Sequence, residues 1–309
     1  MSPLQLRNHI PIGSPARREP TDGTESAMRV SLGFEPAWFT ARCDVDLGIR
    51  WHTDLYARHD ALVKMKQELL RAFPAATYWD PSNDDDLWTI SGCYGAFVIP
   101  WIMGCDLQYA HDRWPTIVRR PERSREEVES LSADDFLSND RMAELTAQME
   151  AIASEAGQIH GYLNWQEELN NAFNLRGDSI FLDMFDKPGF VHALFSMICD
   201  VIIGFAQRVQ RQQRASGFYI DQLSVSNCVM NMIAPETYET FVFPYDRRIA
   251  EAFERFGVHT CNWDVTPYLE VLSQLPKVGY LDMGIISDLK RARAMFPEAR
   301  RAVLYSPVK

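Results

Sequence analysis

The second half of the chain alternates between short apolar segments and longer segments whose apolar residues recur at helical spacing. Such an alternation predicts parallel strands joined by right-handed helical crossovers. Five units of this kind favour an α/β fold, a (β/α)8 TIM-type barrel. The alternative is an open doubly wound sheet, but no GxGxxG follows a predicted strand. The predicted strands are 158–164, 218–225, 258–263, 278–284 and 301–307, and the predicted helices are 165–177, 178–188, 190–217, 235–257, 266–276 and 288–297.

The first half of the chain shows the same helical spacing in two places. Leu62, Met65 and Leu69 share one face of a predicted helix over 56–73, and a second helix is predicted over 140–156. Residues 1–27 are polar and broken by prolines, which predicts a flexible leader before a single barrel domain at 28–309. Because the chain ends directly after a predicted strand, either the N-terminal half supplies the missing strands or the barrel is incomplete at the C-terminus.

Composition narrows the function classes. The 309-residue chain has a net charge of -11 and no basic run, which argues against nucleic acid as a partner. The longest apolar runs, AFVIPWIMG and FSMICDVIIGFA, look too short or too interrupted to span a membrane. The six cysteines are scattered and none belongs to a CxxC pair. We therefore expect a reduced, cytoplasmic protein.

Polar side chains follow the predicted strands, where a barrel gathers its active site. His259 and Cys261 lie two residues apart, so on a strand they would point the same way, and imidazole and thiolate are preferred zinc donors. This HxC pair predicts a metal site, although a structural histidine beside a buried cysteine gives the same pattern. The candidates for substrate binding or catalysis at the other strand ends are Asn164, Trp165, Asp221, Asp282 and Tyr305.

Each remaining candidate has a structural alternative. Asp282 fits a third metal ligand or a carboxylate that caps a turn, and Asp221 fits a catalytic acid or base or a helix anchor. Cys228 could approach the same place, but a small buried core residue fits it better. Arg42, in an aromatic stretch near the start, could bind an anionic substrate.

Three stretches resemble the uroporphyrinogen decarboxylase superfamily. The resemblance covers roughly 28–309 and is strongest over 157–305. The predicted helix that begins with PETYETFVFPY and the strand that bears the HxC pair together support the resemblance better than either does alone. The stretches are GYLNWQEELNNAFNLRGDSIFLDMFDKP, GFYIDQLSVSNCVMNMIAPETYETFVFPYDRRIAEAF and GVHTCNWDVTPYLEVLSQLP.

The resemblance implies one of two activities. The decarboxylase branch acts on uroporphyrinogen without a cofactor and uses an arginine-rich RQAGR loop, which PAWFTARCDVDLG replaces here. The corrinoid-dependent methyltransferase branch holds zinc through an HxC pair, an acidic residue and a later cysteine. His259 and Cys261 match the pair and Asp282 matches the acidic position, but no cysteine follows Cys261.

The sequence therefore favours a zinc-assisted methyltransferase that moves a methyl group between a small methylated substrate or thiol acceptor and a corrinoid protein. The expected cofactors are zinc and a corrinoid held by a partner protein, and a homodimer is among the assemblies to expect. Asp221 would orient substrate or relay a proton. The rivals are a cofactor-free decarboxylase, in which Arg42, Arg50 and Arg113 would converge, and a degenerate, non-catalytic barrel.

Overall fold

The computed structural model describes residues 34–74, 84–118 and 122–304. The chain divides into two compact units. The first contains 1–118, 139–164 and 208–220, and the second contains 119–138, 165–207 and 221–309. The predicted leader and Tyr305 lie outside the described residues, and the single domain predicted for 28–309 stays a prediction.

The second unit is built on a parallel sheet of five described strands. Consecutive strands are neighbours in the order β3-β4-β5-β6-β7, as in a barrel sheet and unlike a doubly wound one. Every residue of β4, and every residue of β6 after its first, is buried, because both faces of a parallel sheet are covered. The strands are β3 Trp165–Gln166, β4 Gln222–Ser226, β5 Arg255–His259, β6 Val278–Gly284 and β7 Arg300–Leu304.

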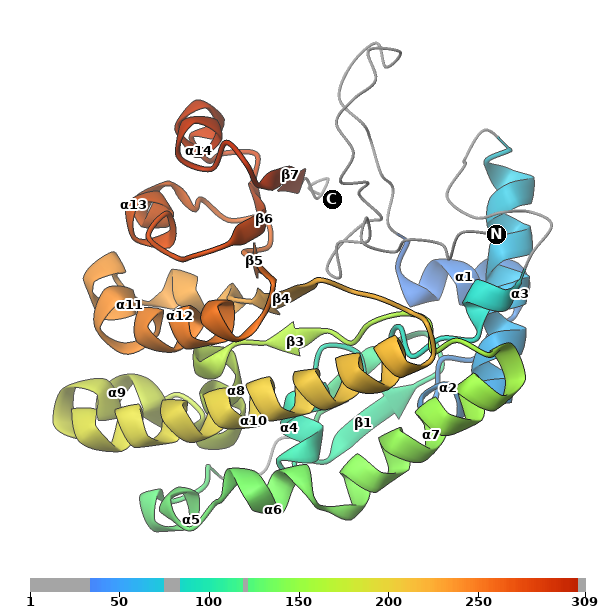
Figure 1. Ribbon diagram of the computed structural model, residues 1–309, viewed down its shortest axis with the longest axis horizontal. Helices are drawn as coiled ribbons and strands as arrows, with labels where there is room; N and C mark the ends of the chain where they lie inside the picture. Colours follow the sequence, from blue (N-terminus) through green and yellow to red (C-terminus); the bar gives the residue numbers. More distant parts are fainter. Residues whose placement is uncertain (1–33, 75–83, 119–121, 305–309) are drawn as a thin grey trace. The chain divides into compact units, whose positions relative to one another are not determined.

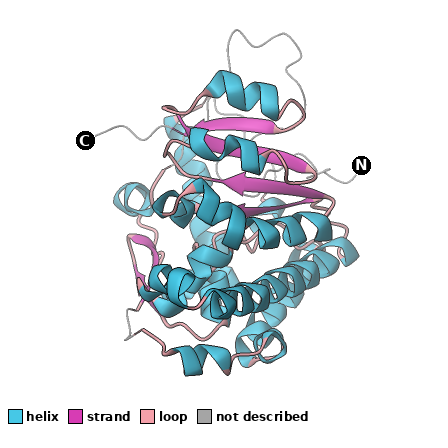
Figure 2. Ribbon diagram, turned by 90° about the vertical axis from the view of Figure 1, so that its left-hand side faces the viewer, coloured by secondary structure: helices cyan, strands magenta, loops and turns pink. Residues whose placement is uncertain are grey.

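Helices connect these strands. In Figures 1 and 2 the helices that follow β4, β5 and β6 lie on the same side of the sheet. Side-chain caps fix several of their starts: Glu167 accepts hydrogen bonds from the first backbone N–H groups of α8, and Asp288 accepts one in α14. The elements are α5 Arg125–Glu129, α6 Ala133–Leu137, α8 Glu168–Arg176, α9 Ser179–Asp186, η3 Cys228–Met232, α11 Pro235–Phe241, α12 Phe243–Ala252, η4 Thr266–Tyr268, α13 Leu269–Leu272 and α14 Leu289–Met295.

The first unit is mainly helical. Asp54 caps α3 and Asn139 caps α7, so both predicted helices of the first half are confirmed. Trp51, Leu47 and Phe39 form part of a core between the first three helices. The elements are α1 Pro36–Cys43, α2 Ile49–Thr53, α3 Leu55–Ala72, η2 Asp85–Leu87, α4 Val98–Ile102, the antiparallel pair β1 Leu107–Ala110 and β2 Arg113–Ile117, and α7 Asp140–Ala156.

One strand was predicted with the wrong bounds, whereas the long helix predicted over 190–217 is present. The strand predicted at 158–164 is irregular apart from one bridge at His160, and β3 begins only at Trp165. The apolar run at 195–206 belongs to α10, Pro188–Ala215, which by length and composition alone could cross a membrane. Its apolar window has a mean hydropathy of 1.9 and is 56% buried inside the protein, and buried core helices of globular proteins meet the same criterion.

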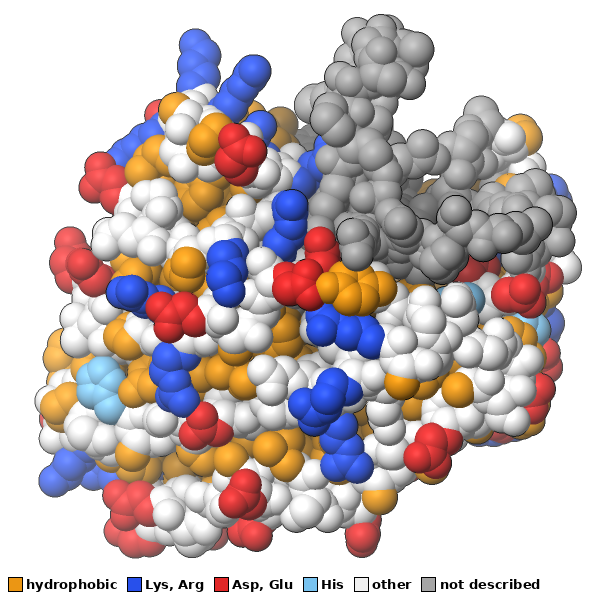
Figure 3. All heavy atoms as spheres, in the orientation of Figure 1, with side chains coloured by type: hydrophobic (Ala, Val, Ile, Leu, Met, Phe, Trp, Pro, Cys, Tyr) orange, Lys and Arg blue, Asp and Glu red, His pale blue; other side chains and the backbone are white. Residues whose placement is uncertain are grey.

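The surface carries both signs of charge. On the face drawn in Figure 3, acidic and basic side chains are interspersed among apolar ones, and neither sign gathers into one continuous patch.

Candidate metal centre

The register of β4, β5 and β6 brings four polar side chains to one place, those of Cys228, His259, Cys261 and Asp282. Ser226, the last residue of β4, pairs with His259, the last residue of β5. The backbone N–H of Asn227 then donates to the His259 carbonyl at 2.8 Å, so the two chains stay together past their strands. Cys228 and Cys261 each follow two residues after this pair. They therefore occupy equivalent positions beyond the carboxyl ends of adjacent parallel strands.

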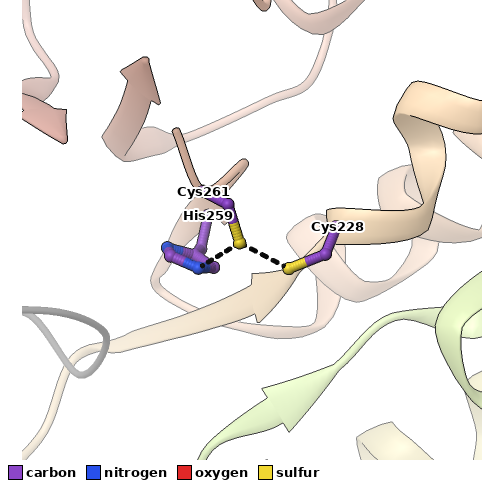
Figure 4. A group of neighbouring side chains, drawn as sticks. All are labelled: Cys228, His259 and Cys261. Atoms are coloured by element: carbon purple, nitrogen blue, oxygen red, sulfur yellow. Dashed lines mark hydrogen bonds between the residues drawn. The ribbon is translucent and has the colours of Figure 1, made fainter. Parts of the chain in front are cut away.

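Three of these side chains converge, as Figure 4 shows. The sulfurs of Cys228 and Cys261 are 2.9 Å apart, and the Cys261 sulfur lies 3.2 Å from His259 Nε2. All three atoms lie within 4.8 Å of one another, and all three residues are partly buried. Cys261 has left the strand and adopts a φ of 59°, a conformation uncommon for residues other than glycine. That turn, not strand alternation, directs its sulfur back toward the histidine.

Asp282 lies behind the histidine. Its Oδ2 accepts a hydrogen bond from His259 Nδ1 at 2.5 Å and one from the Tyr280 hydroxyl at 2.9 Å. Its Oδ1 accepts from the backbone N–H of Thr260 at 2.7 Å. The carboxylate is fully buried. Because Nδ1 is bound to Asp282, Nε2 is the ring nitrogen that faces the two sulfurs.

The pKa values of the three clustered side chains are shifted in different directions. The hydrogen bond to Cys228, helped by the imidazole of His259, lowers the pKa of Cys261 to about 5, although burial opposes this. The same hydrogen bond and burial raise the pKa of Cys228. Burial lowers the pKa of His259, but its bonds to Asp282 and Cys261 outweigh that effect and raise the pKa to about 10. One thiolate and one imidazolium therefore lie beside a neutral thiol.

Buried carboxyl groups occupy the region beside Cys228. Asp246 accepts hydrogen bonds from Asn227 Nδ2 at 2.8 Å and from the Tyr238 hydroxyl at 2.6 Å. Burial raises the pKa of Asp246 to about 7, although these two hydrogen bonds lower it. Burial and the nearby Asp246 raise the pKa of Glu167 and of Glu168 well above the usual range. Asp246 is therefore about half protonated near pH 7, and Glu167 and Glu168 hold their protons more tightly than a carboxyl in water does.

Comparisons with known proteins give this geometry a family. The sequence model of uroporphyrinogen decarboxylase (URO-D) matches residues 90–296, more than half of the chain. The chain belongs to the URO-D family. The α/β fold of the TIM-barrel type and the resemblance stated from the sequence are thereby confirmed.

One solved structure similar to this URO-D family member is a methyltransferase from Methanosarcina mazei. The two share 15% sequence identity with a TM-score of 0.66, and the match covers 94% of this chain and 81% of that one. At this identity the likeness concerns the fold. No curated protein matches the sequence.

The structure places the predicted site residues differently from the sequence analysis in three cases. Cys228, interpreted as a core residue, is the third member of the cluster. Asp282, expected as a ligand, instead holds His259 through Nδ1. Asp221 does not follow a strand: β4 begins after it, and its Oδ2 lies 3.6 Å from Arg255 Nε at the start of β5. Asp221 is therefore at the opposite end of the strands from the cluster.

The predicted substrate residues do not join the cluster either. Trp165 is a core residue whose ring packs edge-on against Phe205 at 4.9 Å. Asn164 directly precedes β3. Arg42 belongs to the first unit, where its Nε lies 2.6 Å from Glu68 Oε1 and its guanidinium lies over the Trp38 ring. Tyr305 is outside the described residues.

The signal for Cys228 was present in the sequence. LSVSNC and FGVHTC are both apolar strand ends, and aligning them as neighbouring parallel strands places Ser226 opposite His259 and Cys228 opposite Cys261. Neither strand end shows this correspondence by itself, because it depends on the register between two strands.

Proposed function

We propose that this URO-D family member is a zinc-assisted methyltransferase whose metal is held by Cys228, His259 and Cys261. The observation that carries the proposal is the convergence of the three ligand atoms within 4.8 Å, with the histidine oriented by a buried carboxylate.

The donor set fits zinc. Two thiolates and one imidazole are a known combination for catalytic zinc, in which three protein ligands leave a fourth position for water or substrate. The contact between His259 and Asp282 is the carboxylate–histidine arrangement that accompanies zinc-bound imidazoles, because it fixes the tautomer and raises the basicity of the ligand nitrogen. Tyr280 and Thr260 hold that carboxylate in turn.

Binding of a metal cation at this site requires two protons to leave the protein. Metal binding requires both cysteines as thiolates and His259 with a free Nε2 lone pair, so the thiol proton of Cys228 and the Nε2 proton of His259 must leave. Asp282 keeps the Nδ1 proton in place during that exchange. When bound, zinc supplies a Lewis acid that lowers the pKa of a thiol substrate at the fourth position.

Methyl transfer is the reaction class that this site supports best. The chain belongs to the URO-D family and has the fold of a structure described as a methyltransferase. Zinc with two thiolate ligands suits activation of a thiol, which is a good methyl acceptor once deprotonated. We propose a small thiol or methylated compound as one reactant and a corrinoid carried by a partner protein as the other.

Metal analysis of the purified chain is the first test. We expect one zinc per chain, retained through dialysis, and loss of that zinc in Cys228→Ser and His259→Ala. Cys43→Ser is the matched control, because Cys43 is also partly buried but lies on α1 and outside the cluster. A folded wild-type chain without metal, or zinc retained by both variants, would refute the assignment.

The activity test uses methylcobalamin and a panel of small thiols. We expect demethylation of the corrinoid, seen as a change in its visible spectrum, only with zinc-loaded protein. Zinc-loaded protein without turnover on any thiol would leave the metal site standing and reject the reaction class.

The decarboxylase alternative has weaker support. Arg42, Arg50 and Arg113 would have to bind substrate carboxylates, yet each lies within 4.0 Å of an acidic side chain of the protein. Incubation with uroporphyrinogen and analysis of released CO₂ tests it directly, and we expect no release.

A further inference from the structure

The two sulfurs of the cluster are unusually close. Cys228 Sγ and Cys261 Sγ are 2.9 Å apart, about 0.9 Å farther than the ~2.05 Å of a disulfide bond. The sulfur atoms also point toward each other from two different segments, η3 and the turn after β5. Bond formation requires the two sulfurs to approach each other by that difference.

We infer that Cys228 and Cys261 are a site of reversible covalent modification, and that they form an intramolecular disulfide when the metal is absent. The inference rests on the proposed function only in that the same two sulfurs serve as ligands there. The disulfide itself requires no metal and no methyl transfer.

The surrounding backbone favours this bond. The hydrogen bond from Asn227 N to His259 O holds the two segments together immediately before the cysteines. Both cysteines lie outside regular strands, so their side chains can rotate without breaking the sheet ladder. Both are also partly exposed, whereas Cys93 and Cys199 are fully buried. A small oxidant can therefore reach this pair, and its partner thiol is already in place.

A small-molecule disulfide such as oxidised glutathione can serve as the two-electron oxidant. The Cys261 thiolate attacks one glutathione sulfur, the glutathione S–S bond breaks, and one glutathione thiolate leaves. The Cys228 sulfur then loses its proton and attacks the Cys261 sulfur of the mixed disulfide, which releases the second glutathione. Two protein thiols are oxidised by two electrons, and one glutathione disulfide is reduced to two thiols.

Oxidation and metal binding exclude each other. A disulfide sulfur has no thiolate charge to give to zinc, so the oxidised site retains only the His259 nitrogen. Reduction by a thiol restores both ligands. The cluster would thus lose its metal under disulfide stress and recover it afterwards.

The test treats metal-depleted full-length protein with oxidised glutathione, blocks remaining thiols, and maps the peptides by mass spectrometry. We expect a Cys228–Cys261 crosslink, an intact mass lower by two hydrogen atoms, and full reversal by dithiothreitol. In Cys228→Ser the reaction should stop at a glutathione adduct on Cys261. Cys105→Ser, the control for a partly buried cysteine outside the cluster, should crosslink like wild type.

Zinc gives the second arm. Protein preloaded with zinc should crosslink at least ten-fold more slowly, and oxidation should release zinc in step with crosslinking. If both thiols stay free, or if adducts form on Cys43 and Cys105 but no crosslink appears, the inference is wrong while zinc binding still stands. If the crosslink forms in a chain that never binds zinc, the proposed function fails and the disulfide survives.

Discussion

Replacing Asp282 by Asn tests the centre through a residue that touches no proposed metal. The substitution keeps the size and burial of the side chain. Its amide oxygen can still accept the hydrogen bond from the Thr260 N–H, but its NH₂ group then faces His259 Nδ1 and the Tyr280 hydroxyl. The NH₂ group is itself a donor, so it cannot accept the hydrogen bonds that His259 Nδ1 and the Tyr280 hydroxyl now donate to the carboxylate.

The expected loss in zinc affinity follows from the histidine tautomer. With no acceptor at Nδ1, the neutral imidazole favours its proton on Nε2, the nitrogen that faces Cys228 and Cys261. Losing such an orienting carboxylate typically weakens metal binding about 10- to 100-fold. That range corresponds to about 1.4 to 2.7 kcal/mol of binding free energy.

The assay is competition for zinc against a chromophoric chelator at fixed pH. Asp264→Asn is the matched control, because Asp264 is exposed and accepts a hydrogen bond from the backbone of Thr266 in the same segment. We expect the control to bind zinc like wild type. Circular dichroism on both variants separates a loss of affinity from a loss of folding.

Two results would refute the reasoning. Unchanged affinity in Asp282→Asn would mean that the carboxylate does not orient the histidine. X-ray absorption showing one oxygen ligand in the wild type and none in the variant would make Asp282 a ligand, as the sequence alone suggested, and would overturn the geometry described above.

Three further predictions concern stability. Because Asp246 has a pKa of about 7 in the folded chain and an ordinary one when unfolded, stability should fall as pH rises from about 4 to 7. Asp246→Asn should therefore recover up to about 4 kcal/mol above pH 7, and a gain independent of pH in urea melts would contradict this. Gly284→Ala should cost about 2 kcal/mol or more in thermal unfolding, because a Cβ there would lie 2.2 Å from the Asn262 carbonyl oxygen. In the control Gly189→Ala, on α10, the new Cβ meets nothing within 4 Å, so this variant should be as stable as wild type or slightly more stable, since alanine favours the helix. Asp183→Asn leaves two arginines without their shared buried carboxylate, so we expect a loss on the order of 3 kcal/mol in the same assay, and an unchanged melting temperature would count against it.

Much of the fold could be predicted because its signals are local. The helix at 140–156 has an Asn N-cap, an apolar stripe and a glycine at its C-terminus, and the structure reproduces its bounds. The strand at 278–284 is likewise as predicted, since continuous apolar residues between turns leave few alternatives. The segment 158–164 failed for the opposite reason. Its short apolar stretch has no helical or strand period long enough to decide, and its glycine adopts a φ of 90°.

The site was less predictable because it depends on register between strands. His259 and Cys261 were found from their spacing, but the strand-parity argument for them is wrong in detail, since β5 ends at His259. Asp221 was misplaced because apolar residues before it look like a strand that in fact starts at Gln222. When the start of a strand is misjudged by a few residues, a side chain expected at the carboxyl ends of the strands lies at their amino ends. No local pattern in the sequence fixes where the strand starts.

The charges around Cys228 explain why a metal suits this cluster better than a free thiolate pair. The hydrogen bond to Cys261, burial and the negative charge of the Cys261 thiolate raise the pKa of Cys228. A second negative sulfur there would face repulsion in a partly buried site, and a nearby cation would offset it. His259 supplies one positive charge in the metal-free state, enough for one thiolate. A divalent ion would replace that proton and stabilise both thiolates, so the electrostatics of the three side chains support the proposed ion of charge two with soft ligands.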